Sequence, residues 1–152
     1  MTSLRSFLHG MPIDLPSYQL GKIFAFAEVV GAGVKKLAFS APLSPEEMDQ
    51  LMKGAEEIAK EWGVSLYLEK DVLTTDLFDE EFTRGKHVLL IYKDPEVKDA
   101  YIALKNKKVY LVGAGQYQGE ARKEIAREMG RLLSYQEDHI EKMLSDGPIS
   151  PD

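Results

Sequence analysis

Two copies of the tetrapeptide VGAG, at residues 30–33 and 112–115, are the part of this sequence that most resembles a ligand-binding motif. The second copy stands in VYLVGAGQYQGEAR, which has the pattern of a strand, a glycine turn and the start of a helix. Glycines at such a turn let an anion approach the free N–H groups of the helix. The first copy follows an apolar stretch with helical spacing, where a helix would end and its dipole would repel an anion.

The second copy therefore predicts an anion site. Gly113, Gly115 and Gln116 would contribute backbone groups, and Arg122 would contribute positive charge. The alternative is that these glycines only pack a strand exit against a helix. The spacing is one residue longer than a dinucleotide fingerprint, and the chain beyond it has the pattern of helix. A complete dinucleotide-binding fold at this turn is excluded, because the strand that would carry the ribose-binding acid is missing.

A second group of reactive side chains follows a predicted strand at residues 64–68, in the segment EKDVLTTDLFDEEF. Asp71 and Asp76 are the candidate catalytic residues, since a carboxylate at the head of a loop can act as a general base. Thr74 and Thr75 would donate hydrogen bonds to the same ligand. The remaining carboxylates, at residues 79–81, predict the acidic first turn of a helix, and we predict no metal site.

Hydrophobic periodicity supplies the elements that would position these residues. Helices are expected at 17–30, 45–62, 77–82, 95–105, 120–133 and 135–144, and strands at 36–40, 64–68, 87–92 and 109–112. The helix at 45–62 has the clearest signals, because Ser44 and Glu47 form a capping-box pattern and Gly63 follows its last apolar residue. The continuous apolar run at 87–92 is typical of a central strand covered on both faces.

Strands that alternate with helices predict an α/β fold, a three-layer arrangement of a mainly parallel sheet of about four strands with helices on both faces. The 152 residues form one domain, 1–152, in which 1–15 and 146–152 would be flexible tails. Ligands of parallel sheets bind at the carboxyl ends of the strands. This rule adds Ser40 and Lys93, which follow two of the strands, to the predicted site.

Composition narrows the class of protein. The net charge of −6 argues against a nucleic-acid partner, and no apolar run approaches the roughly 20 residues that would cross a membrane. The N-terminal residues lack the pattern of a secretory signal, so a cytoplasmic location is expected, and the absence of cysteine excludes disulfides and cysteine metal sites. A small sheet leaves edges to cover, which predicts a homo-oligomer assembled through helices 16–30 and 120–144.

The segment GRLLSYQEDHIEKML, residues 130–144, is similar to the C-terminal segment of an uncharacterised prokaryotic family. In that family a Gly-x-Leu-Leu-Gly-Tyr-Pro motif precedes paired cysteines. Ser134 stands here at the second glycine, Gln136 at the proline, and Asp138 and His139 at the cysteines. The resemblance covers about a tenth of the chain and implies no activity.

These residues together predict binding of a small anionic metabolite or nucleotide at the strand ends, either by a binding protein or by a phosphate- or nucleotide-handling enzyme. The alternative is a non-catalytic subunit or regulatory module that acts through protein–protein contacts, in which the glycines are structural. No cofactor and no particular reaction follow from the residues.

Overall fold

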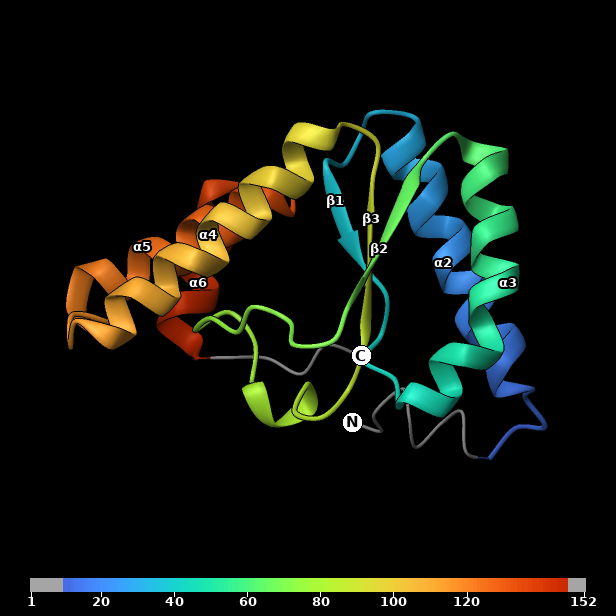
Figure 1. Ribbon diagram of the computed structural model, residues 1–152, viewed down its shortest axis with the longest axis horizontal. Coiled ribbons are helices and arrows are strands. Elements are labelled where there is room, and N and C mark those ends of the chain that lie inside the picture. Colours follow the sequence, from blue (N-terminus) through green and yellow to red (C-terminus); the bar gives the residue numbers. More distant parts are fainter. Residues whose placement is uncertain (1–9, 148–152) are drawn as a thin grey trace.

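The computed structural model describes residues 10–147, and its helices and strands are drawn in Figure 1. In chain order they are α2 (Leu15–Gly31), β1 (Leu37–Phe39), α3 (Pro45–Trp62), β2 (Ser65–Glu69), the 3₁₀ helix η1 (Glu80–Phe82), β3 (Val88–Tyr92), α4 (Pro95–Gly113), α5 (Gly119–Leu132) and α6 (Glu137–Asp146). The predicted tails, 1–15 and 146–152, lie for the most part outside the described residues. None of the helices within 10–147 is long and apolar enough to cross a membrane.

The sheet has three strands in the order β1-β3-β2, and the central strand β3 is antiparallel to both neighbours. In the register, Leu37 and Ser65 both lie opposite Tyr92, while Glu69 lies opposite Val88. Helix α3 joins β1 to β2, which run in the same direction without touching because β3 lies between them. This is a split β-α-β unit.

The predicted three-layer fold with a mainly parallel sheet of about four strands is therefore wrong. The order of strands and helices along the chain does not fix the direction of each strand. The same order is compatible with a parallel sheet and with a sheet in which an antiparallel strand lies between two parallel ones. The direction of β3 is set instead by the connection 70–87, which contains only η1 and returns the chain against the direction of β2.

β3 has the burial that its continuous apolar sequence predicts, and its position at the centre of the sheet is confirmed. Val88, Leu90 and Tyr92 belong to one core cluster, which includes residues of α4, α5 and α6. Leu89 and Ile91 belong to a second cluster, formed with α2 and α3. Figure 1 shows the two groups of helices on opposite sides of the strands.

Helix α3 confirms the helix predicted at 45–62 together with its signals. The Glu47 N–H donates to Ser44 Oγ at 3.2 Å, and the Ser44 N–H donates to Glu47 Oε1 at 3.0 Å, which completes the capping box. Gly63 ends the helix with a φ of 67°. All these signals are local in sequence, so no tertiary contact is needed to recognise them.

The fourth predicted strand, 109–112, is wrong because α4 continues through it to Gly113. Side chains on one face of α4 contact the loop that follows β2. The Tyr101 hydroxyl accepts from the Leu73 N–H, and the Lys108 ammonium donates to the carbonyl of Thr74. Residues seven apart on a helix share a face, so these two contacts need helix through residue 108, and the β propensity of VYLV is overridden.

The short helix predicted at 77–82 is reduced to the single turn η1. Asp79 caps this turn, because its Oδ1 accepts from the Glu81 N–H at 3.0 Å. The rest of the connection 70–87 has no regular structure and packs its apolar side chains inward, with Val72, Leu73 and Leu77 buried. The segment forms one wall of the site described below.

Candidate functional site

The second VGAG copy lies at the C-terminal end of α4, not at the start of a helix. The Ala114 N–H donates to the Tyr110 carbonyl at 3.0 Å, and the Gln116 N–H donates to the Leu111 carbonyl at 2.8 Å. Gly115 has a φ of 68°, the left-handed conformation that commonly follows the last turn of a helix. The strand-to-helix turn from which an anion site was predicted is therefore absent.

The first VGAG copy forms the same cap at the end of α2. Gly33 has a φ of 81°, and the Val34 N–H donates to the Val29 carbonyl at 3.0 Å. The end of a helix predicted for residues 30–33 is confirmed. Both copies present the carbonyl end of a helix dipole, and their N–H groups bond to carbonyls of their own helix.

Three predicted site residues come together in a polar cluster between the loop after β2 and the helices α4 and α5. Arg122 binds Asp76 in a bidentate fashion, with nitrogen–oxygen distances of 2.7 to 2.9 Å. The Lys108 ammonium donates to Thr74 Oγ1 at 2.9 Å. The ring of Tyr117 receives both cations, since Lys108 Nζ and Arg122 Cζ lie 5.0 and 5.1 Å from its centroid.

Arg122 and Asp76 form an ion pair in this cluster, whereas Lys108 bonds to uncharged acceptors. Each oxygen of Asp76 accepts from Arg122, and Lys108 reaches both acceptors of Thr74. Burial lowers the pKa of the Lys108 ammonium. These bonds connect the loop to α4 and α5, and the catalytic role predicted for Asp76 stays a prediction.

The other predicted residues are dispersed. Thr75 caps its own loop, since its Oγ1 accepts from the Leu77 N–H at 3.2 Å. Asp71 is exposed, and within residues 10–147 its carboxylate makes no hydrogen bond or ion pair. Lys93 donates to the Gly31 carbonyl at 3.1 Å and lies at the opposite end of the sheet from Ser40, because β3 runs against β1.

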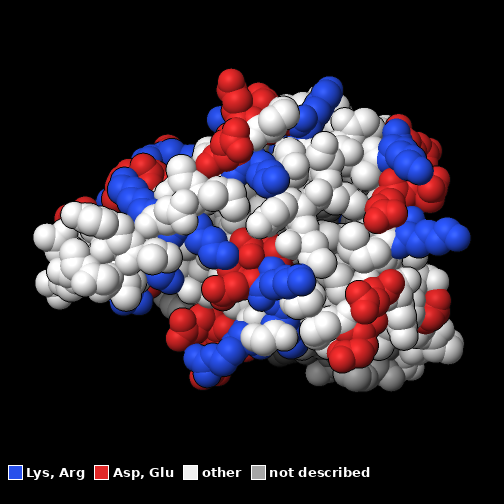
Figure 2. Space-filling model, viewed as in Figure 1, with Lys and Arg blue, Asp and Glu red and all other residues white. Residues whose placement is uncertain are grey.

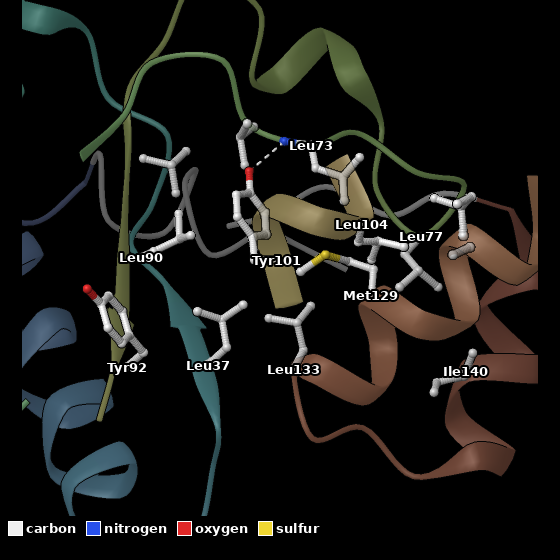
Figure 3. Packing of buried hydrophobic residues seen from close by; sticks show 14 of the residues in the cluster. Leu37, Leu73, Leu77, Leu90, Tyr92, Tyr101, Leu104, Met129, Leu133 and Ile140 are labelled. Atoms are coloured by element: carbon white, nitrogen blue, oxygen red, sulfur yellow. Dashed lines mark hydrogen bonds between the residues drawn. The ribbon is translucent and has the colours of Figure 1, made fainter. Parts of the chain in front are cut away.

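A buried network that the sequence did not indicate holds the start of the same loop. The Glu69 carboxylate, with a side chain 5% exposed, accepts from the Tyr101 hydroxyl at 2.9 Å and the Lys105 ammonium at 3.1 Å. Its other oxygen accepts from the Asp71 N–H at 3.0 Å. The Tyr101 hydroxyl also accepts from the Leu73 N–H at 2.9 Å, the bond dashed in Figure 3. Every group is satisfied, so the network is structural.

The loop fixed in this way forms one wall of a cavity of about 270 Å³. The opposite walls come from α2, from residues 35–42 around β1, and from the turn between α5 and α6. Most of the lining is apolar, including Phe26, Phe39, Val72, Phe78, Val88 and Leu133. An apolar cavity with a few polar groups is the usual form of a small-molecule site, and this one suits a ligand at the small end of the range.

The polar groups of the cavity are unequally engaged. Ser40 uses its hydroxyl within the sheet, since Oγ accepts from the Leu89 N–H at 2.8 Å and donates to the Ala41 carbonyl at 3.0 Å. Of the predicted ligand-binding residues, Ser40 and Thr74 line this cavity. Lys22, Lys35 and Asp79 add charge to its walls.

Lys35 resembles Lys108 in its bonding but lines the cavity, which Lys108 does not. Its ammonium donates to the Leu133 carbonyl and lies 5.0 Å from the centroid of the Tyr135 ring. Burial lowers its pKa, and no carboxylate in the described part of the chain pairs with it. A half-buried cation bonded only to a carbonyl and a ring attracts an anion more strongly than a solvated lysine does.

The turn between α5 and α6 is held against the start of β1 in the same place. The Lys36 N–H donates to Ser134 Oγ at 2.9 Å, and Ser134 has a φ of 64°, which favours glycine. Gln136, two residues beyond Ser134, occupies the cap position of α6. Lys35 and Leu133 are 98 residues apart, so no local signal in the sequence could have paired them.

Within residues 10–147, no group of three or more histidine, aspartate or glutamate side chains is placed to hold a metal ion. Comparisons of the chain with protein-family models, with curated proteins and with solved structures find no match. The cavity and its side chains are therefore the basis of the function proposed below.

Proposed function

We propose that the protein binds a small carboxylate with an apolar body in the cavity beside β1, and that the ammonium of Lys35 binds its carboxylate. The observation that carries the proposal is the half-buried Lys35, which stands at an apolar cavity and has no carboxylate partner among the described residues. The proposed ligand is an anion, as the sequence predicts. The cytoplasmic location expected from the sequence stays a prediction.

The cavity walls favour this class of ligand over a phosphate or nucleotide. Its volume of about 270 Å³ is below the usual range for ligand pockets, and its lining is mainly aliphatic and aromatic. One ammonium bonded to a carbonyl can add a carboxylate oxygen as a further acceptor, because a lysine has three donors. Transfer of the apolar body from water supplies the rest of the affinity.

A titration with hexanoate and with uncharged hexanamide, followed by the backbone amide signals of residues 35–42 and 72–79, tests the proposal. We expect hexanoate to bind with a dissociation constant on the order of 1 mM, as suits a ligand of this size. Hexanamide should bind much more weakly. The affinity for hexanoate should fall as pH rises through the lowered pKa of Lys35, because the ammonium loses its proton.

The variant Lys35→Met removes the charge and keeps an unbranched apolar stem, so it should fold and lose hexanoate binding. Lys36→Met is the matched control, because the adjacent side chain is exposed and lies outside this cavity. Hexanoate shifts of equal size in the wild type and Lys35→Met, or no shifts in residues 35–42 and 72–79, would show that the proposal is wrong.

A second candidate function, an assembly module, is favoured by apolar side chains at the end of α4. Val109, Tyr110 and Val112 are 65%, 71% and 55% exposed. In Figure 2 the end of the molecule formed by the α4–α5 turn is largely white, whereas charges of both signs are mixed over the rest of this face. Nearby charges are paired within the chain, as between Lys107 and Glu128. Two identical apolar patches can pack together without bringing unpaired like charges close to each other, because the charges around the patch are already paired. We therefore propose a second copy of this chain as its partner.

Light scattering tests this assembly. The double variant Val109→Lys/Tyr110→Lys places cations at a helix C-terminus, where the dipole stabilises them, so the helix should be kept. We expect the wild type to scatter as a dimer and this variant as a monomer. Val34→Lys is the control, since Val34 is 75% exposed at a distant turn. A monomeric wild type at all concentrations would exclude the assembly.

A further inference from the structure

The cavity beside β1 contains a second charged group without an ionic partner, the carboxylate of Asp79. One of its oxygens accepts from the Glu81 N–H at 3.0 Å, and among the residues from 10 to 147 no cation pairs with it. Asp79 is half-buried, so its charge is incompletely solvated. The walls of one small cavity thus present an ammonium and a carboxylate that do not bind each other.

The neighbours of the two charged groups indicate that they lie toward different ends of the cavity. The Lys35 ammonium contacts Leu133 and the ring of Tyr135, which lie in the turn between α5 and α6. Ser134 in this turn accepts a hydrogen bond from Lys36, the residue just before β1. Asp79 caps η1, which is followed by the tight turn that leads into the first residues of β3.

The start of β3 lies beside the other end of β1. The Ser40 N–H donates to the Leu89 carbonyl at 2.9 Å, and Leu43 bridges His87. Between Leu37 and Ser40 an extended chain advances roughly 10 Å, at about 3.3 Å per residue. The side chains between these ends that line the cavity are mainly apolar, among them Phe39 and Val88.

We propose that the ligand is dipolar, an ω-amino carboxylate whose carboxylate binds Lys35, whose ammonium binds Asp79, and whose methylene chain lies between them. This inference rests on the function proposed above and adds the second anchor. An α-amino acid carries its ammonium and carboxylate groups on one carbon, so we expect it to reach only one of the two anchors. The site therefore selects by the spacing of charges as well as by their signs.

Three probes of nearly equal size separate the possibilities: hexanoate, 6-aminohexanoate and its isomer 2-aminohexanoate. We expect 6-aminohexanoate to bind roughly tenfold or more tightly than hexanoate, because a charge-assisted hydrogen bond is added. The isomer 2-aminohexanoate should bind no better than hexanoate. Amide signals of residues 78–83 should move with 6-aminohexanoate and not with hexanoate.

The variant Asp79→Asn keeps an oxygen that can accept from the Glu81 N–H, so η1 should stay capped. It should reduce the affinity for 6-aminohexanoate to that for hexanoate and leave hexanoate binding unchanged. Glu81→Gln is the matched control, because this exposed carboxylate does not line the cavity. It should leave both affinities unchanged.

The outcomes distinguish the two proposals. If hexanoate binds and 6-aminohexanoate gains nothing, or keeps its gain in Asp79→Asn, the dipolar ligand is wrong and the carboxylate site stands. If neither probe moves the signals of residues 35–42, both proposals are overturned. If 2-aminohexanoate binds as tightly as 6-aminohexanoate, the selection by charge spacing is refuted.

Discussion

The hydroxyl of Tyr101 joins two parts of the fold, and its removal in Tyr101→Phe should destabilise the protein strongly. The residue is completely buried, and its hydroxyl donates to Glu69 and accepts from the Leu73 N–H. Without it the buried Leu73 N–H has no acceptor, and Glu69 keeps only the donors from Lys105 and Asp71. An unsatisfied buried donor costs about 1–3 kcal/mol, and a hydrogen bond to a charged group contributes about 1.5–3 kcal/mol.

Because the two losses share one hydroxyl and do not add fully, we expect the unfolding free energy of Tyr101→Phe to fall by about 3 kcal/mol. For a domain of this size that lowers the melting temperature by roughly 6–12 °C. Urea denaturation followed by circular dichroism measures the change. Tyr110→Phe is the control, because Tyr110 is 71% exposed, and its unfolding free energy should stay within about 0.5 kcal/mol of the wild type.

Comparison of the wild type with Tyr101→Phe at different pH values tests the electrostatics of the network. Burial and the neighbouring Glu69 raise the pKa of Tyr101 far above its usual range. The unfolded chain therefore releases this proton first as pH rises, and the stability that Tyr101 contributes at neutral pH is lost progressively above about pH 10. The difference in unfolding free energy between the wild type and Tyr101→Phe should shrink in that range. A difference below about 0.5 kcal/mol at pH 7 would refute the role assigned to the hydroxyl.

Three further substitutions test other contacts, each by the same denaturation assay. Gly130→Ala places a methyl group 2.7 Å from Ile140 Cγ1 and should cost about 1–3 kcal/mol by overpacking; an unchanged stability would mean that α5 and α6 are not in close contact. Gly115→Ala has room for its Cβ, but the φ of 68° is strained for alanine, so the substitution should cost about 1–2 kcal/mol and leave hexanoate binding intact. Loss of hexanoate binding would indicate that the ligand binds at the glycine turn. Arg122→Ala breaks an ion pair with Asp76 whose side chains are 49% and 30% exposed, and it should cost at most about 1 kcal/mol; a larger loss would show that solvent screens this pair less than its exposure indicates.

The elements that could be predicted from the sequence are those whose signals are local. The Ser44 cap and Gly63 define α3 without reference to the rest of the chain, and the apolar run of β3 identifies a strand buried on both faces. The direction of β3 could not be predicted, because an apolar strand has the same composition in either orientation. The segment VYLV was misassigned because contacts of Tyr101 and Lys108 with a distant loop decide its conformation.

The candidate site was predicted only in part, for a related reason. Ser40 and Thr74 line the cavity because they follow β1 and β2, two strands whose carboxyl ends lie at the same end of the sheet. Lys93 follows β3 and lies at the opposite end of the sheet, because β3 is antiparallel to β1 and the rule that carboxyl ends meet holds only for parallel strands. The importance of Lys35 depends on burial by Leu133 and Tyr135, which a single sequence without contacts does not reveal.

The position of β3 has a consequence for the order in which the protein can fold. Every strand pairing among the residues from 10 to 147 includes β3, although it is the last strand to be synthesised. While a ribosome has released only α2, β1, α3 and β2, the two strands have no backbone partner in each other, and α2 and α3 lack the side chains of Leu89 and Ile91. Pairing of strands far apart in sequence is slow, and unpaired strand edges aggregate. The nascent chain is therefore most exposed to misassociation until residue 92 has emerged, and synonymous codon changes that slow translation between the emergence of β2 and that of β3 should lower its soluble yield.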